Sequence, residues 1–307
     1  MEWLVTDFGP NFGDNFRGFT FIKALKAAHP EARLTCWITP ELHSSLSGLL
    51  PFLGFVDRFL VRPRGPQDSY RLIFDLLKRG LADGKPFTLS HLPGGAGPDG
   101  AAYHKLIPTA EPWFLAKLLA QAPLEGPDLE NQGETLCRLL ELSPEAVAAQ
   151  LPLFGQRGPA GDLLCVGLSR PRKSDRKQLA PGRVAEVWRA LAESGRPLAA
   201  LDYQDWSPPP PIPGLLDLRL APWEEKVELL NRAAWFIGSD GGLLHFAAAC
   251  GSPTLGFYGA DPTGRHGPLV GPFPRQTPFG EHRFFHEYRI FLAATSRLVE
   301  GWQVVEK

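Results

Sequence analysis

Residues 236–262 read FIGSDGGLLHFAAACGSPTLGFYGADP, and the pattern of apolar residues in them indicates the class of fold. Two apolar runs, Trp235–Ser239 and Thr254–Tyr258, have the length of buried strands, and a short apolar helix fits between them. A strand, a helix and a second strand in this order indicate one βαβ unit of a parallel sheet.

The junction between the first strand and the helix holds more glycine and polar residues than a simple turn between a strand and a helix requires. Asp240 can cap the helix, and Gly241 can take a tight turn. With Gly242, the glycine pair also lets the backbone approach a ligand, to which the first helical turn offers unpaired N–H groups. His245 falls in that turn and can donate to a phosphate oxygen. A structural interpretation stays open, because a lone histidine on an apolar helix is more often a packed residue.

The rest of the chain repeats the alternation of strands and helices in two halves. In the first half, strands are predicted at residues 2–8, 33–39, 57–63 and 85–92, and helices at 17–30, 68–84 and within 112–151. In the second half, strands are predicted at 163–169, 197–202 and 215–220, and helices at 182–195 and 222–233. The glycine-rich stretch 93–109 reads as a long loop. This alternation indicates an α/β protein with parallel sheets covered on both faces.

The length of 307 residues favours two domains of about 150 residues each. Residues 153–162 are rich in glycine and proline and separate the two halves. We predict one Rossmann-like domain over residues 1–154, on the acceptor side, and a second over 162–278, which binds the donor. Residues 279–307 read as a helical segment that packs back on the first domain. The two domains are expected to face each other across a cleft, with ligands outside the carboxyl ends of the strands.

Composition excludes several classes of protein. Lys and Arg number 32 against 33 acidic residues, so no basic field favours nucleic acid as a partner. The four cysteines are isolated, without zinc spacing or a disulfide framework, which predicts a reducing cytosol. No apolar run approaches the length of about 18 residues that a membrane-spanning helix needs, and no leader peptide is expected.

Two further strand ends carry candidate site residues. Asp14 follows the first predicted strand and can act as a general base, although an N-cap aspartate is an equally good interpretation. After the strand at 163–169, five basic residues fall within eight positions: Arg170, Arg172, Lys173, Arg176 and Lys177. Such a cluster at a strand end suits a diphosphate, and the alternative is a solvated charged loop.

Together these residues describe the displacement of a diphosphate leaving group. The carboxylate takes a proton from an attacking hydroxyl, and Lys177, His245 and backbone N–H groups stabilise the charge that develops on the diphosphate. Because the sequence holds no Asp-x-Asp, a magnesium-bridged site of that type is unsupported, and no metal or other cofactor is expected. The dinucleotide fingerprint of nicotinamide oxidoreductases is also missing.

Three segments resemble glycosyltransferase family 9, the lipopolysaccharide heptosyltransferases. FIGSDGGLLHFAAACGSPTLGFYGADP is similar to that family's Asp-Thr-Gly-Leu-x-His-Leu-Ala-Ala-Ala element and the strand after it. GDNFRGFTFIKALKAAHPEARL resembles its amino-terminal Gly-Asp motif, and RKQLAP resembles its Lys-x-Trp-Pro segment. The resemblance implies the GT-B fold of two facing Rossmann-like domains and metal-independent, inverting transfer.

The resemblance also implies the ligands and the roles of residues. It favours an ADP-sugar, usually ADP-heptose, as the nucleotide-diphospho-sugar donor, and a glycan or glycolipid as the acceptor. It implies a cytoplasmic enzyme with at most peripheral contact to the inner face of the membrane. Asp14 is then the general base, and the donor-binding residues are Arg176, Lys177, Asp240, Gly241, Gly242, Leu243 and His245.

This chain departs from the family pattern at two places that bear on activity. Gly241 stands where the family has threonine, which removes a hydroxyl that could contact phosphate. The glycine-rich turn of the family after the next strand is replaced by DYQDWSPPPP, at residues 202–211. These departures keep a second hypothesis open, a catalytically silent GT-B protein that binds a nucleotide-sugar or glycan. The base, the sugar, the acceptor and the oligomeric state are not readable from the sequence.

Overall fold

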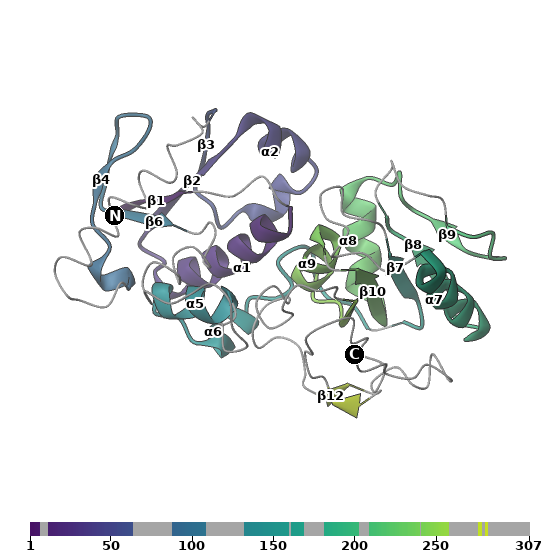
Figure 1. Cartoon of the computed structure of the whole chain (residues 1–307). Coiled ribbons are helices and arrows are strands. Elements are labelled where there is room, and N and C mark those ends of the chain that lie inside the picture. The colour runs from purple at the N-terminus through teal and green to yellow at the C-terminus, as the bar shows by residue number, and fades with distance from the viewer. Residues whose placement is uncertain are drawn as a thin grey trace. The chain divides into compact units, whose positions relative to one another are not determined.

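The protein is described from a computed structural model, which divides into two compact units, Met1–Leu153 and Phe154–Lys307 (Figure 1). The structure describes residues 1–6, 12–63, 88–108, 132–159, 161–168, 181–202, 209–239, 241–257, 276–277 and 280–281. The helix predicted at residues 68–84 therefore lies outside the described residues, as does nearly all of the segment 279–307.

The first unit contains a parallel four-stranded sheet in the order β3-β2-β1-β6. Its strands are β1 (Glu2–Thr6), β2 (Arg33–Ile38), β3 (Arg58–Val61) and β6 (Lys105–Pro108). The first strand in the chain thus lies inside the sheet, with Leu4 opposite Thr35 on one side and Leu106 on the other.

Helix α1 (Phe12–Ala28) follows β1 and contacts α5 (Gln132–Leu140) and α6 (Pro144–Ala148) (Figure 1). Its buried side chains include Phe16, Phe19, Phe21, Ile22 and Leu25. Between β2 and β3 lie the short helix α2 (Pro40–Ser45), capped by the Thr39 hydroxyl, and the 3-10 turn η1 (Leu50–Leu53).

Two predictions for this unit are wrong. The described part of the predicted strand at 85–92 contains a 3-10 turn, η2 (Leu89–His91). Lys105 Nζ donates a hydrogen bond to Leu89 O at 2.6 Å and stabilises this turn. The stretch 93–109 contains a small hairpin of β4 (Gly95–Ala96) and β5 (Ala102–Tyr103). Strand β6 follows it and completes the sheet.

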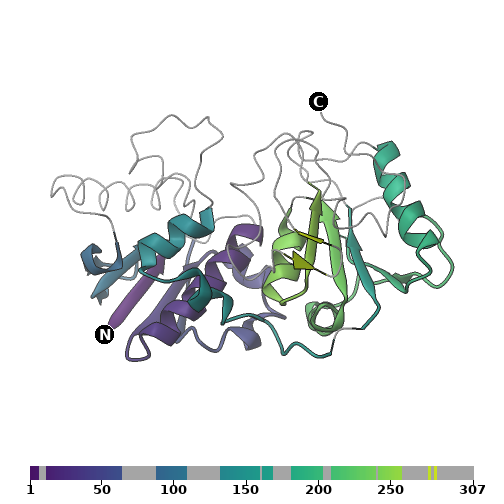
Figure 2. The ribbon, with the colours of Figure 1, turned by 90° about the horizontal axis from the view of Figure 1, so that it is seen from below.

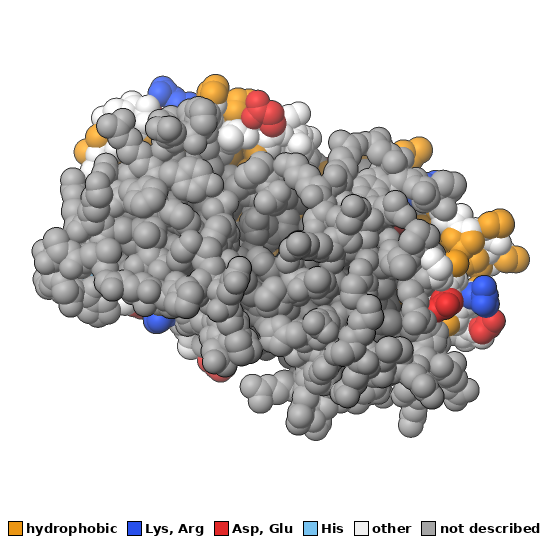
Figure 3. Space-filling view, in the orientation of Figure 1, with side chains coloured by type: hydrophobic (Ala, Val, Ile, Leu, Met, Phe, Trp, Pro, Cys, Tyr) orange, Lys and Arg blue, Asp and Glu red, His pale blue; other side chains and the backbone are white. Residues whose placement is uncertain are grey.

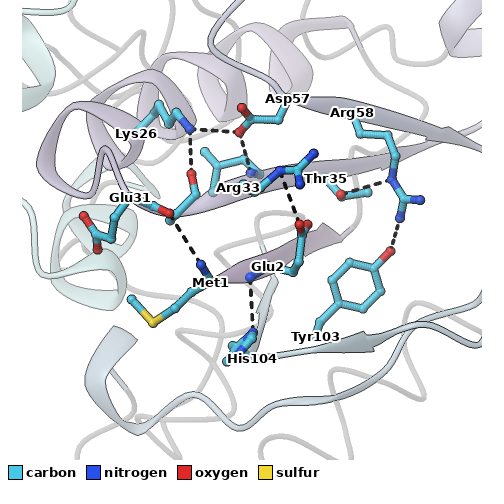
Figure 4. Close-up of polar contacts among 12 residues, drawn as sticks. Met1, Glu2, Lys26, Glu31, Arg33, Thr35, Asp57, Arg58, Tyr103 and His104 are labelled. Atoms are coloured by element: carbon cyan, nitrogen blue, oxygen red, sulfur yellow. Dashed lines mark hydrogen bonds and ion pairs between the residues drawn. The ribbon is translucent and has the colours of Figure 1, made fainter.

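Polar contacts gather where the strands of this sheet begin (Figure 4). Arg33 Nε pairs with Glu2 Oε1 at 3.3 Å, and the Glu2 N–H donates to His104 Nδ1 at 3.1 Å. Lys26 Nζ pairs with Asp57 Oδ2 at 2.9 Å. These contacts tie the amino ends of the strands together, on the edge opposite the one where β1 runs toward α1.

The second unit contains a parallel five-stranded sheet in the order β11-β10-β7-β8-β9. Its strands are β7 (Leu164–Gly167), β8 (Leu198–Ala200), β9 (Leu216–Asp217), β10 (Trp235–Ser239) and β11 (Thr254–Phe257). A separate antiparallel pair joins β12 (Gln276–Thr277) and β13 (Gly280–Glu281). Among the described strands, the edge strand β9 pairs only with β8; its Leu216 is exposed, and hydrophobic side chains lie on the surface in this part of the unit (Figure 3).

Helices cover both faces of this sheet (Figure 2). Val187, Trp188 and Leu191 of α7 (Pro181–Glu193) share one core cluster with Trp235 and Ile237 of β10. On the other face, the ring of Phe246 in α9 (Gly242–Ala249) lies 4.9 Å from that of Trp223, which begins α8 (Trp223–Arg232).

Two parallel sheets flanked by helices confirm the predicted α/β fold. Within the described residues, no helix is long and apolar enough to cross a membrane. The strand order of the second unit matters most for function. Because β7 leads to α7 on one face and the neighbouring β10 leads to α9 on the other, the chain leaves these adjacent strands in opposite directions. Ligands of open α/β sheets bind at such a switch point.

Candidate functional site

The carboxyl ends of β7 and β10 form the centre of the candidate site. Gly167 pairs with Gly238, so Ser239 is the last residue of β10 at this edge. A Cβ added at Gly167 would lie 2.9 Å from Phe236 Cζ and 3.5 Å from Leu243 Cδ1. Glycine at position 167 therefore makes room for α9 to pack closely against the strand end.

The N-terminus of α9 opens at this edge. Its N-cap is Gly241, whose backbone is extended (φ 174°) and makes no side-chain cap hydrogen bond. The prediction that Asp240 caps this helix and that Gly241 takes a tight turn is therefore wrong, since the helix begins one residue later than such a cap requires. The Leu244 N–H donates to Gly241 O at 3.1 Å. The N–H groups of Gly242 and Leu243 come before this bond and have no intrahelical partner.

The structure brings four of the predicted donor-binding residues, Gly241, Gly242, Leu243 and His245, into one helical turn. The side chains of Leu243 and His245 are buried, 6% and 8% exposed. The Leu243 side chain packs toward Gly167, so only its backbone N–H can serve a ligand. At Gly241 an added Cβ would meet only Ser239 O, at 3.8 Å, and this position is sterically open. The turn is thus a cradle of backbone N–H groups at the positive end of a helix dipole.

Asp240, Arg176 and Lys177 lie outside the described residues, and their roles stay predictions. Residues 169–180 connect β7, which ends at Gly167, with α7, which begins at Pro181. By connectivity, the cationic cluster therefore follows the strand next to β10.

A second polar group lies at the same edge, after β9. Arg219 holds Asp217 by two hydrogen bonds, Nε to Oδ1 at 2.8 Å and Nη2 to Oδ2 at 2.7 Å. Lys226 in α8 donates from Nζ to Arg219 O at 2.9 Å and lies 5.1 Å from the centre of the Trp223 ring. These contacts fix the loop between β9 and α8.

Charges in this group shift one another's pKa values. The hydrogen bonds from Arg219 lower the pKa of Asp217, and Asp217, with a smaller contribution from the buried Asp202, raises the pKa of Arg219. Burial lowers the pKa of Lys226, a shift that Glu225 partly opposes. The loop after β9 is therefore fixed by paired charges and by a desolvated ammonium group.

In the first unit, Asp14 lies in the first turn of α1, directly after β1. Helix α1 begins at Phe12, so the alternative interpretation of Asp14 as an N-cap residue is wrong. The helix is held in place by Lys23, whose Nζ donates to Gln150 O at 2.8 Å and Pro152 O at 2.9 Å. Because α1 follows β1 and is anchored by Lys23, its first turn, which contains Asp14, lies near the carboxyl end of β1.

The cysteines of the described part of the chain are not disposed to act as nucleophiles. Its cysteines, Cys36, Cys137, Cys165 and Cys250, are free and buried. Burial raises the pKa of the Cys165 thiol to about 12, which keeps it protonated and unreactive. The described residues contain no group of three or more His, Cys, Asp or Glu side chains that could hold a metal ion.

Sequence reasoning passed over Ser239. The residue is only 6% exposed, and its hydroxyl has no hydrogen-bond partner among the described residues. The available signal was a polar residue at the end of an otherwise apolar strand, immediately before Asp240.

Comparisons with known proteins agree with this geometry. Residues 221–273, which include β10, α9 and β11, match the sequence profile of Glycosyltransferase family 9 (heptosyltransferase). No curated protein sequence matches the chain.

Solved structures share the fold at low identity. "E. coli heptosyltransferase WaaC with ADP" is 16% identical, with a TM-score of 0.53 over 88% of this chain and 91% of that one. The E. coli glycosyltransferase TibC is 15% identical, with a TM-score of 0.52 over 98% of this chain and 76% of that one. A family 9 glycosyltransferase from Veillonella parvula is 14% identical, with a TM-score of 0.50 over 89% and 84%.

The profile covers the strand, helix and strand that build the switch point, and the structural matches extend the GT-B-like fold over nearly the whole chain. In residues 221–273 the chain is therefore similar to glycosyltransferase family 9 (heptosyltransferase), and as a whole it shares the GT-B-like fold of solved heptosyltransferases.

Proposed function

We propose that the protein transfers a sugar, with inversion and without a metal ion, from a nucleotide-diphospho-sugar to a glycan or glycolipid acceptor. The N-terminus of α9 at the switch point of the second unit carries this proposal. Its uncapped backbone N–H groups, at Gly242 and Leu243, suit a diphosphate. The family profile matches this same segment.

An ADP-sugar is the donor class that we propose. The solved structures of WaaC are described with ADP and with ADP-2-deoxy-2-fluoro heptose, and one of TibC with ADP-D-beta-D-heptose. We propose a heptose as the sugar on the same support.

In the proposed reaction, the acceptor oxygen attacks the anomeric carbon of the donor sugar. The new carbon–oxygen bond forms as the bond between that carbon and the diphosphate oxygen breaks, and the electron pair leaves with the diphosphate. The acceptor hydroxyl gives its proton to the Asp14 carboxylate. Attack from the face opposite the leaving group inverts the anomeric centre.

The leaving diphosphate gains negative charge as this bond breaks. The α9 N–H groups offer fixed dipoles for that charge, and Arg176 and Lys177 are the proposed cations. Such contacts stabilise the transition state more than the bound donor, because the leaving oxygen carries more negative charge there than in the intact donor.

A donor screen tests the proposed donor class. Purified protein is mixed with ADP-heptose and with UDP-, GDP- and dTDP-sugars, and thermal shift and nucleotide release are measured with truncated lipopolysaccharide as acceptor. We expect stabilisation and ADP release with ADP-heptose, unchanged by EDTA, and a product whose anomeric configuration is inverted by NMR. Stabilisation without nucleotide release from any donor would favour the silent binding protein instead.

Asp14→Asn tests the catalytic base. Loss of a general base costs about 10²–10⁴-fold in rate. We therefore expect kcat to fall by that factor while the Kd for ADP stays within about twofold. Transfer by Asp14→Asn at the wild-type rate would refute the assignment of the base.

A further inference from the structure

The Ser239 hydroxyl is a buried polar group for which the fold supplies no partner. The residue is 94% buried, and Oγ makes no hydrogen bond to any described residue. A buried hydroxyl without a partner destabilises a protein, so such groups are rare and call for an explanation. Ser252, another buried serine of the same unit, shows the ordinary case, because Ser252 Oγ donates to Leu230 O.

The place of Ser239 in the sheet suggests what the partner is. By the alternation of β10, its side chain lies on the same face as Trp235 and Ile237, which pack against α7. Leu168, which continues β7 beside it, is apolar and buried, and its side chain cannot accept a hydrogen bond. Ser239 is the last residue of β10, two positions before the N-cap of α9, so it lies where the strand leads to the N-terminus of that helix.

We propose that Ser239 Oγ donates a hydrogen bond to a phosphate oxygen of the donor diphosphate and so positions the leaving group. This assignment rests on the proposed function. A serine hydroxyl rotates freely and can donate to an anion that approaches from the strand edge. The positive end of the α9 dipole favours a negatively charged phosphate oxygen as the partner of this hydroxyl, over a neutral hydroxyl of the donor sugar.

The open position at Gly241 is consistent with this role. No side chain at the N-cap offers a hydroxyl to the same ligand, and an added Cβ would meet only Ser239 O at 3.8 Å. Ser239, two residues earlier, is the hydroxyl that the chain places at the junction between β10 and α9.

The test compares Ser239→Ala with Ser252→Ala, each measured by calorimetric titration with ADP and with adenosine, and by thermal unfolding without ligand. Ser252 is a matched control because it is a buried serine that precedes β11, at the opposite edge of the sheet. For Ser239→Ala we expect the Kd for ADP to rise about tenfold, since hydrogen bonds to charged groups are worth about that factor. The ratio of its adenosine Kd to the wild-type value should stay near one.

Thermal unfolding separates this role from a structural one. Without ligand, Ser239→Ala should have an unchanged or higher Tm, because it removes a buried hydroxyl that the protein leaves unsatisfied. Ser252→Ala should lose about 2–4 °C and keep the wild-type Kd for ADP.

Either of two results would overturn the assignment alone: wild-type ADP affinity in Ser239→Ala, or a Tm that falls as far as that of Ser252→Ala. Failure of the wild-type protein to bind ADP, UDP, GDP or dTDP would overturn the proposed function and this assignment with it.

Discussion

Asn231 Nδ2, in α8, donates a buried hydrogen bond to the backbone oxygen of Phe154, the first residue of the second unit, at 3.1 Å. The two residues are 77 positions apart in the sequence, and the bond holds the first residue of the second unit against helix α8 of the same unit. The ring of Phe154 continues this core, 5.6 Å from that of Phe246 in α9.

Gly155→Ala should break this arrangement. Gly155 has φ +68°, which costs a residue with a side chain about 1–2 kcal/mol. Its added Cβ would also overlap Asn231 Nδ2 and lie 3.2 Å from Val227 Cγ1. With the loss of the buried hydrogen bond, we expect a decrease of about 2–4 kcal/mol in the free energy of unfolding, measured by urea denaturation.

Gly182→Ala is the control for that experiment. Gly182 lies in the first turn of α7 in the same unit, and an added Cβ would meet nothing within 4 Å. The variant should equal the wild type or gain up to about 1 kcal/mol from helix propensity. If both alanine variants unfolded at the same urea concentration, the bond to Asn231 would have no role in stability.

The pair between Lys26 and Asp57 should make stability depend on pH in acid. Burial raises the pKa of Asp57, but the hydrogen bonds from the Leu34 N–H and Lys26 outweigh it and lower the pKa below its ordinary value of 3.8. A carboxyl with a lower pKa in the folded state contributes stability above its ordinary pKa and loses it as pH falls through the folded value.

Asp57→Asn should therefore be less stable than the wild type at neutral pH, and the difference in Tm should shrink as pH falls from about 5 to about 3. Thermal unfolding followed by circular dichroism measures the two curves. Glu31→Gln removes an exposed carboxylate of the same unit and serves as the control. A constant difference between Asp57→Asn and the wild type at every pH would show that the pair does not drive the dependence.

If Arg176 and Lys177 bind the donor diphosphate as proposed, nucleotide binding should be sensitive to salt. Lys177→Ala or Arg176→Ala should raise the Kd for ADP about tenfold, and the larger effect identifies the residue that contacts the diphosphate. Affinity of the wild type should fall as NaCl rises from about 50 mM to about 500 mM, because salt screens the attraction. Arg189→Ala, on the exposed side of α7, makes the same change in net charge away from the strand end. Equal losses in all three variants would indicate a general charge effect without a specific contact.

Much of the second unit could be predicted from its sequence because local patterns set it. The apolar run Trp235–Ser239 is β10 residue for residue, and the described part of the predicted strand at 254–258, residues 254–257, forms β11. In both, a short apolar run is bounded by glycine, proline or aspartate, and burial within a parallel sheet follows from that pattern.

The first unit shows where local patterns fail. Only Leu106 and Ile107 are apolar in β6, and the strand exists because it pairs with β1, about a hundred residues earlier. Residues 88–92 have the composition of a strand but form η2, because Lys105 and Glu141 bind its backbone and side-chain groups. Interactions with residues so far away in the sequence cannot be predicted from the pattern of about ten neighbouring residues.

The candidate site divides in the same way. The glycine pair identified the N-terminus of α9, yet the helix begins at Gly242, with Gly241 as its N-cap in place of Asp240. The sequence marks Ser239 only as a polar residue at the end of an apolar strand; its lack of a hydrogen-bond partner depends on which side chains the neighbouring strand and α7 place around it.

The position of β1 between β2 and β6 also has a consequence for biosynthesis. As the nascent chain leaves the ribosome, β1 appears before the other strands of this sheet and pairs with β2, to which β3 is then added, while the other side of β1 stays open until residues 105–108 have been made. During that interval the growing polypeptide exposes an unpaired strand edge, the feature through which incompletely synthesised chains associate with one another.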